Sequence, residues 1–178
     1  MDTTATPTSW TIDPAHANIE FGVRHLMIST VKGRFTGISG TIAAGERGFA
    51  DARIDVTIDA KTIDTREPQR DTHLRSADFF DVDKHPHATL TVTSAHLAGP
   101  AVLECQGTFE AAGHVGPVTF TARIQEAAAH AITLSAELEL DRSEFAMTWS
   151  PLHMASMTAR GIVTARFTRS ERTGPPTA

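Results

Sequence analysis

The sequence predicts an all-β protein whose antiparallel sheet closes into a barrel, with one short helical segment. Most of the chain alternates apolar and polar residues with period two, which is typical of strands that are buried on one face. Short turns separate at least eight such stretches, and this favours an up-and-down barrel over a two-sheet sandwich. Residues 65–86 are rich in charge and break the alternation, so we expect them to form the helical segment and to cover one opening of the barrel.

The first half of the chain supplies three strands. Residues 1–9 are polar and contain a proline, so we expect a disordered tail there. A strand follows over residues 15–25, with its apolar side chains at odd positions. Residues 30–44 form a long ribbon whose three glycines suit bends in a sheet that must curl. Residues 50–59 then alternate without error, which predicts a regular strand.

The charge-rich stretch predicts a short helix around residues 66–80. Pro68 suits the first turn of a helix, where the missing N–H costs nothing, and Thr65 or Asp64 could cap it. The His-Pro step at residues 85–86 should end any helix and begin an extended segment.

The second half of the chain again reads as strands joined by turns. The expected strands cover residues 88–97, 101–111, 117–126, 131–140 and 156–169, with a shorter strand over residues 144–149. Residues 170–178 have the composition of a disordered tail, and no linker divides the chain. We therefore expect a single β-barrel domain over residues 10–169.

The charge of the chain limits its partners. With 40% hydrophobic and 21% charged residues, its composition is that of an ordinary globular domain. The 16 Lys and Arg residues against 21 Asp and Glu residues give a formal net charge of −5. Nucleic acids and anionic membrane surfaces require clustered positive charge, so we expect neither as the main partner.

Cys105 is the one cysteine of the sequence, which excludes an intrachain disulfide and a cluster of thiolate ligands. The first residues have neither the basic region nor the apolar run of a secretory signal. No stretch approaches the roughly 20 apolar residues that cross a bilayer. We therefore expect a cytoplasmic protein with no stable membrane insertion.

Several motifs of the chain resemble one known family. They are WTIDPAHANIEFGVRHLMIST at residues 10–30, RDTHLRSADFF at 70–80, GTFEAAGHVGPVTFTA at 107–122 and LDRSEFAM at 140–147. The most specific part runs from Asp64-Thr65 through RDTHLRSADFF to the His-Pro step. From Trp10 to about Phe167, the chain resembles the YceI-like family of lipid- or polyisoprenoid-binding domains.

The resemblance implies an extended, lipocalin-like barrel of eight antiparallel strands, whose long apolar cavity takes an isoprenoid or fatty chain. It also implies a protein without catalytic residues, because the family is not known for enzymatic activity. The chain departs from many members by lacking a secretory signal and by having Met27 and Ala146 at positions of glycine. Met27 is expected near the barrel mouth, where its flexible side chain could narrow the cavity or adapt to an apolar guest.

We therefore expect a non-catalytic binding or carrier protein for a polyisoprenoid, quinone-like or fatty-acid-derived ligand, and no cofactor beyond that lipid. Each buried CH₂ contributes about 0.8 kcal/mol, so a guest of roughly 20 carbons gains roughly 16 kcal/mol before the entropic costs of binding. Residues on the apolar faces could form the cavity wall or could simply be core. They are Phe21, Val23, Phe35, Val56, Ile58, Leu90, Val92, Phe120, Ile124, Leu134, Leu138, Met157 and Val163.

A second group of residues is expected at the mouth of the barrel, near the ligand head group. Its members are His25, Met27, Arg70, His73, Arg75, Phe79 and Phe80. Positive side chains in this group could meet a phosphate, pyrophosphate or carboxylate. The alternative is that Arg75 pairs with Asp71, while Asp78 and the two phenylalanines simply anchor the segment.

Two other function classes remain open. The first is a metal-dependent enzyme using a histidine cluster, since His85 and His87 would share a strand face with His16, His25 or His73 nearby. The sequence has neither an HExxH metal motif nor a G-x-S-x-G hydrolase motif, and we assign no metal ligands and no catalytic residues. The second is a ligand-free dimeric interaction module. A homodimer is compatible with either reading, because symmetric dimers are common.

Overall fold

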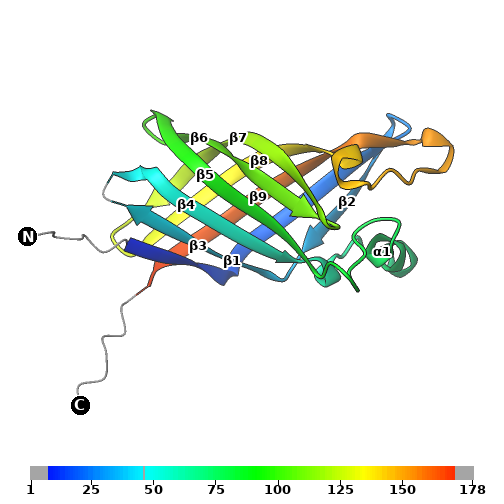
Figure 1. The fold of residues 1–178 in the computed structure, drawn as a ribbon, viewed down its shortest axis with the longest axis horizontal. Coiled ribbons are helices and arrows are strands. Elements are labelled where there is room, and N and C mark those ends of the chain that lie inside the picture. Colours follow the sequence, from blue (N-terminus) through cyan, green and yellow to red (C-terminus); the bar gives the residue numbers. More distant parts are fainter. Residues whose placement is uncertain (1–7, 46, 171–178) are drawn as a thin grey trace, which may run out of the picture.

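The structure, a computed structural model, describes residues 8–45 and 47–170. Within these residues the chain forms one antiparallel sheet of nine strands and one α-helix, α1 (Pro68–Arg75) (Figure 1). The strands are β1 (Thr8–His25), β2 (Ser29–Phe35), β3 (Ile38–Gly45), β4 (Gly48–Asp59), β5 (His87–Gly99), β6 (Val102–Ala111), β7 (His114–Ala127), β8 (Ala131–Asp141) and β9 (Ala155–Arg169).

The sheet closes into a barrel because the long strand β1 pairs along both of its edges. One edge pairs with β9, from Trp10 opposite Arg169 to His25 opposite Ala155. The other edge pairs first with β3 and then with β2. β2 and β3 therefore lie end to end in one position of the barrel, which gives eight positions for nine strands. The predicted closed, eight-stranded antiparallel barrel is confirmed.

The ribbon predicted over residues 30–44 is divided into β2 and β3 by a break at residues 36–37. A Cβ atom on Gly37 would lie 2.9 Å from the Thr62 Cγ2 and 2.9 Å from the Asp59 Cβ. The Gly37 N–H also donates to the Thr62 Oγ1 at 3.0 Å. Glycine is thus required at this break, because the segment that follows β4 packs directly on its backbone.

The helix α1 begins at Pro68, as the sequence predicts, but its N-cap is Glu67 and not Thr65 or Asp64. The Glu67 carboxylate accepts the N–H groups of the second and third helical residues at 3.3 and 2.7 Å. These bonds satisfy two of the donors that a helix start leaves without partners. The helix ends at Arg75, well before the His-Pro step.

The strand predicted over residues 144–149 is wrong. The chain forms a 3-10 turn there, Arg142–Phe145, which begins when the Asp141 carboxylate accepts the Ser143 N–H at 2.9 Å. Ala146 then adopts a left-handed conformation with a φ of 56°, which a strand does not contain. A local side-chain hydrogen bond therefore overrides the apolar-polar alternation at this point.

The apolar faces of the strands point into the barrel, as the alternation predicts. Along β4, the side chains of Ala52, Ile54, Val56 and Ile58 are buried, and the residues between them are more exposed. This parity places the hydrophobic core inside the barrel and leaves the polar side chains on its outer surface.

The predicted tails, residues 1–9 and 170–178, lie mostly outside the described residues, although β1 already begins at Thr8. Among the helices of residues 8–45 and 47–170, none has the length and apolar character needed to cross a membrane.

Candidate ligand-binding cavity and its mouth

An apolar cavity of about 130 Å³ lies inside the barrel, toward the end beside α1. An apolar cavity of roughly 150 Å³ can hold a benzene molecule, so this cavity has room for roughly six carbon atoms. Its lining consists of Ile19, Phe35, Val56, Ile58, Phe80, Ala88, Leu90, Phe109, Ala111, Leu138, Leu140, Arg142, Phe145, Met147, Ala159, Gly161 and Val163.

Among the described residues, Arg142 is the one charged side chain in this lining, and only 8% of the residue is exposed. Its Nη1 donates to the Ser156 carbonyl at 2.6 Å and its Nη2 to the Trp149 carbonyl at 3.0 Å. Its guanidinium carbon lies 5.7 Å from the centre of the Phe79 ring. Arg142 therefore ties the segment between β8 and β9 to the end of the cavity.

Arg142 has no carboxylate partner within 4 Å in the part of the chain that the structure describes. Burial lowers the pKa of the Arg142 guanidinium, because the charged form loses solvation and no nearby anion compensates it. A guanidinium has five N–H donors, and the two carbonyls use only part of this capacity. Arg142 thus borders the cavity with the non-polar part of its side chain, and its charged end lies behind the apolar wall.

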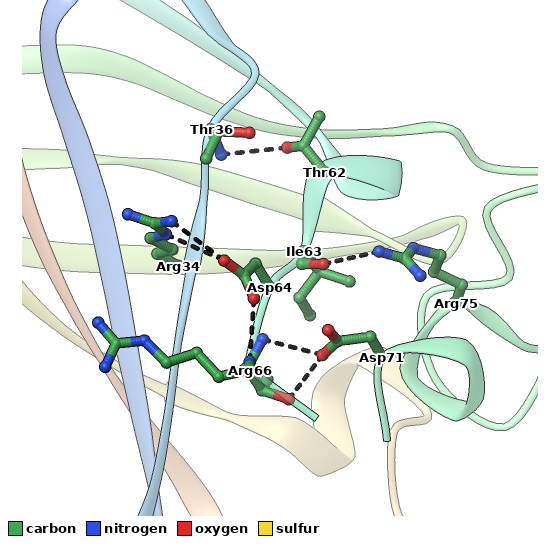
Figure 2. Close-up of polar contacts among 9 residues, drawn as sticks. Arg34, Thr36, Thr62, Ile63, Asp64, Arg66, Asp71 and Arg75 are labelled. Atoms are coloured by element: carbon green, nitrogen blue, oxygen red, sulfur yellow. Dashed lines mark hydrogen bonds and ion pairs between the residues drawn. The ribbon is translucent and has the colours of Figure 1, made fainter. Parts of the chain in front are cut away.

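The segment that contains α1 is held against the barrel by a dense set of polar contacts, shown in Figure 2. The Arg34 guanidinium contacts the Asp64 carboxylate at 3.1 Å, and the two backbones pair at the same point. The Arg75 Nη2 donates to the Ile63 carbonyl at 2.7 Å, and its Nε donates to the Lys61 carbonyl at 2.9 Å. These bonds fix the position of α1 relative to the end of β4.

Asp71 is the buried centre of the same anchor. Its carboxylate accepts the Thr65 N–H at 2.9 Å and the Thr65 hydroxyl at 2.6 Å. The Arg70 Nε in turn donates to the Thr65 Oγ1 at 2.8 Å. Asp71 therefore pairs with Thr65 and not with Arg75, which was the pairing considered from the sequence.

An aromatic cluster joins the α1 segment to the loop before β9. The His73 ring lies edge-on to the Trp149 ring, with centroids 4.3 Å apart, and 5.2 Å from the Phe79 ring. The His73 Nε2 is 2.8 Å from the Asp78 carboxylate, which orients the imidazole. The two segments that close this end of the barrel are thus in contact with each other.

The predicted wall residues fall into three groups. Six line the cavity: Phe35, Val56, Ile58, Leu90, Leu138 and Val163. Four are core side chains outside the lining: Val92, Phe120, Ile124 and Leu134. The remaining three, Phe21, Val23 and Met157, are half-buried on β1 and β9. Ligand contact by any of these residues stays a prediction.

The predicted mouth residues are also divided. Phe80 lines the cavity and packs edge-on against Phe35, with ring centroids 5.7 Å apart. Phe79 and His73 belong to the aromatic cluster, while Arg70 and Arg75 make the anchoring hydrogen bonds described above. His25 and Met27 lie at the β1–β2 turn, where His25 is half-buried and Met27 is exposed.

Sequence reasoning missed several lining residues for two different reasons. Ile19, Phe109, Ala111, Leu140 and Ala159 lie on the inward parity of predicted strands, so the alternation alone could have found them. Phe145 and Met147 lie in the segment that the alternation predicts as a strand, residues 144–149, and Arg142 lies just before it. The motif LDRSEFAM, which contains all three, was the available signal for these residues.

The histidines and the cysteine are not gathered into a centre. Within the described residues, no three His, Cys, Asp or Glu side chains lie close enough together to hold a metal ion. Cys105 is buried on β6, and burial raises the pKa of its thiol to about 11. A thiol with this pKa is protonated at neutral pH and is a poor nucleophile.

Comparison with known proteins agrees with the fold. Protein YceI of Shigella flexneri is 38% identical over 109 residues, which are 61% of this chain and 56% of that protein. A UPF0312 protein of Vibrio parahaemolyticus is 37% identical over 108 residues, which are 61% of this chain and 57% of that protein. The aligned part of the chain thus spans little more than half the length of these curated relatives.

Three solved structures are similar to the barrel. The YceI protein of Campylobacter jejuni has 28% identity and a TM-score of 0.72, covering 83% of this chain and 90% of that chain. Burkholderia cenocepacia BcnA has 18% identity and a TM-score of 0.79, covering 87% and 98%. A polyisoprenoid binding domain from Saccharophagus degradans has 15% identity and a TM-score of 0.73, covering 90% and 98%. The last two similarities concern the fold alone.

The family assignment follows from the sequence itself. The family described as the YceI-like domain matches residues 10–168, which include all but the edges of the described barrel. The match contains the α1 segment, the motif around Arg142 and the strands that line the cavity. The chain therefore belongs to the family of YceI-like domains.

Proposed function

We propose that this chain is a non-catalytic binding or carrier protein that holds the apolar chain of a lipid inside its barrel. The observation that carries the proposal is the cavity of about 130 Å³, whose described lining is apolar apart from Arg142. Apolar chains enter such sites because water leaves both surfaces. The fold similarity to a polyisoprenoid binding domain supports an isoprenoid or a chain of comparable width.

The size of the cavity sets how the ligand would lie. Burial of roughly six carbons contributes roughly 5 kcal/mol, and lost translation and ordering remove at least several kcal/mol of this. A guest held only there would bind weakly. We infer that a longer guest extends from the cavity past Phe21, Val23 and Met157, the half-buried side chains on β1 and β9.

Arg142 is the residue that we assign to the polar end of the ligand. Its guanidinium lies behind the apolar surface of the cavity and keeps N–H donors that the two carbonyls do not use, so an oxygen of a guest that reaches it would meet a charged donor. A carbonyl, hydroxyl or acid group fits this requirement. Phe80 contacts the guest from the α1 segment, while Arg70 and Arg75 serve the anchor of that segment.

Organic extraction of the purified, folded protein followed by mass spectrometry tests this function. A long-chain lipid or isoprenoid should be released in an amount close to one per chain. Elemental analysis of the same sample tests the alternative of a metal-dependent enzyme, which predicts stoichiometric bound metal. Sedimentation of the sample over a range of concentrations covers the dimeric module, which requires a change in mass without a bound lipid. Either of these results with no extractable lipid would contradict the proposal.

A further inference from the structure

Large apolar side chains are exposed on two neighbouring turns at one end of the barrel. The β1–β2 turn presents Met27 and Ile28, which are 81% and 86% exposed, next to the half-exposed Leu26. The loop before β9 presents Leu152, which is 87% exposed. Both turns project beyond the strands at the end of the barrel where α1 lies (Figure 1). We name this surface the apolar tip, made of residues 26–28 and 152.

The backbone of the apolar tip is strained in order to present these side chains. Leu26, Met27 and Leu152 have φ values of 53°, 59° and 52°, and His153 follows with 55°. Side chains with a Cβ adopt this left-handed conformation at a cost, and turns usually place Gly, Asn or Asp there. Strain of this kind is often found at functional sites, although the chain also has it at Ala146. Leucine and methionine at such positions, facing solvent, therefore indicate a contact outside the chain.

The two turns form one firm surface. The Leu26 N–H donates to the Met154 carbonyl at 2.8 Å, which joins the β1–β2 turn to the loop before β9. The Arg24 Nη2 donates to the Met27 carbonyl at 3.1 Å and braces the turn from the outer face of β1. The exposed side chains are therefore held in place relative to one another before any partner arrives.

The two segments that form the apolar tip carry charges of one sign. Residues 21–33 and 146–160 contain no Asp or Glu, although the whole chain has a net charge of −5. Arg24 and Lys32 lie on the outer face beside the tip, and among the described residues no carboxylate is within 4 Å of either. Apolar side chains flanked by unpaired cations are typical of surfaces that bind an anionic lipid bilayer.

We propose that the apolar tip docks the barrel on an anionic membrane surface, with its side chains in the boundary between head groups and acyl chains. Arg24 and Lys32 then lie at the level of the lipid phosphates. This inference rests on the proposed function, because docking would bring the end of the barrel beside the cavity against the source of an apolar chain. A second copy of the chain fits the tip less well, since two convex, cationic surfaces would meet.

Vesicle flotation with phosphatidylcholine, with and without phosphatidylglycerol, tests the docking. The informative variant is Met27→Gly with Leu152→Gly, because glycine removes both the side chain and the strain. The variant should melt at a higher temperature than the wild type and yet bind phosphatidylglycerol vesicles about tenfold more weakly or worse. Leu97→Ser, at an exposed apolar residue near the other end of β5, should bind like the wild type. Lys32→Glu should reduce binding to the anionic vesicles alone.

Three outcomes would overturn the inference: no binding of the wild type to anionic vesicles, equal binding by the double glycine variant, or a self-association that this variant abolishes in the absence of vesicle binding. Gly161→Leu, which fills the cavity, separates the inference from the proposed function. Docking that survives in this variant while lipid uptake is lost supports both proposals. If the wild-type protein takes up lipid but does not bind the vesicles, the carrier function is retained and the docking surface is rejected.

Discussion

At the scale of single residues, Arg142 and Cys105 differ most from the apolar interior around them. Arg142 keeps its charge in a buried position because two carbonyls accept its donors, and this leaves a cation beside the cavity. Cys105 faces the same interior without such partners, and its burial favours the neutral thiol. The barrel thus contains one group that can bind a polar atom and one that behaves as a small hydrophobic side chain.

Cys105 should make the stability of the protein depend on pH in the alkaline range. Burial raises the pKa of the thiol from 9.0 to about 11, so the folded state binds this proton more tightly than the unfolded state does. The corresponding stability is fully present below pH 9 and is lost as the pH rises toward 11. The loss should reach about 2–3 kcal/mol. Denaturant titrations of the wild type and of Cys105→Ala over this pH range measure the loss of unfolding free energy. If both proteins lose the same stability per pH unit, the loss does not come from Cys105.

Ala146→Gly should stabilise the fold. Ala146 has a φ of 56°, where a Cβ costs roughly 1 kcal/mol or more, and glycine adopts this conformation freely. Part of the gain is offset because glycine makes the unfolded chain more flexible, so we expect a net increase of up to about 1 kcal/mol. Thermal melting measures the change. Ala98→Gly, at an exposed strand position without a positive φ, should lower the melting temperature, and a fall for Ala146→Gly as well would contradict the account.

At the scale of elements, the barrel and the α1 segment differ in how they are held. The strands are joined by continuous backbone pairing and share an apolar interior. The α1 segment is held mainly by side-chain contacts, among them Asp71 with Thr65 and Arg75 with the carbonyls of residues 61 and 63, and by one isolated backbone bridge between Arg34 and Asp64. Opening of this segment would therefore cost less than opening of the sheet, and under the proposed function it would offer a path for the ligand.

Strand parity in β4 can be tested with adjacent residues. Val56 is buried and lines the cavity, whereas the Asp55 carboxylate accepts hydrogen bonds from Arg53 on the outer face. Val56→Arg should lower the free energy of unfolding by several kcal/mol and abolish lipid uptake. Asp55→Arg should cost about 1 kcal/mol or less and leave uptake intact. Denaturation and native mass spectrometry check both variants, and equal effects would show that the assigned faces are wrong.

The sequence predicted the elements best where pattern and packing agree. The alternation in β4 and the proline at the start of α1 led to the right elements, because burial on one face and a fixed φ act locally. The prediction failed at residues 144–149, because the turn there begins with a hydrogen bond to the Asp141 carboxylate. Hydrophobic periodicity does not reveal such a bond. The break between β2 and β3 depends on Thr62, a distant residue, and so could not be read from the ribbon itself.

The candidate site was predicted only in part for a related reason. Parity identifies which side chains face inward, but not which of them border a cavity and which fill the core. Val92 and Val56 have the same parity on neighbouring strands, yet only Val56 lines the cavity. The difference depends on the volumes of all facing side chains together, which no single strand contains.

At the scale of the whole molecule, three features lie at the same end of the barrel. The cavity lies toward the end beside α1, the buried Arg142 side chain borders it there, and the apolar tip projects from the same end. All Asp and Glu residues of the chain lie outside residues 21–33 and 146–160, the two segments that form this tip. A barrel built in this way would receive a lipid at one end and keep its opposite end in solvent.

The most direct test of the account is native mass spectrometry of the protein titrated with farnesol and with palmitate, for the wild type and Gly161→Leu. Gly161 lines the cavity, and the nearest atom to a Cβ there is the Glu20 carbonyl oxygen at 4.0 Å, so a side chain can begin there without a close contact and extend into the cavity. Thr164→Leu, on the outer face of the same strand, is the matched control. We expect the wild type and Thr164→Leu to bind one apolar chain and the folded Gly161→Leu to bind none. Binding that is unchanged in Gly161→Leu, or absent from the wild type, would contradict the claim that the barrel interior is the binding site.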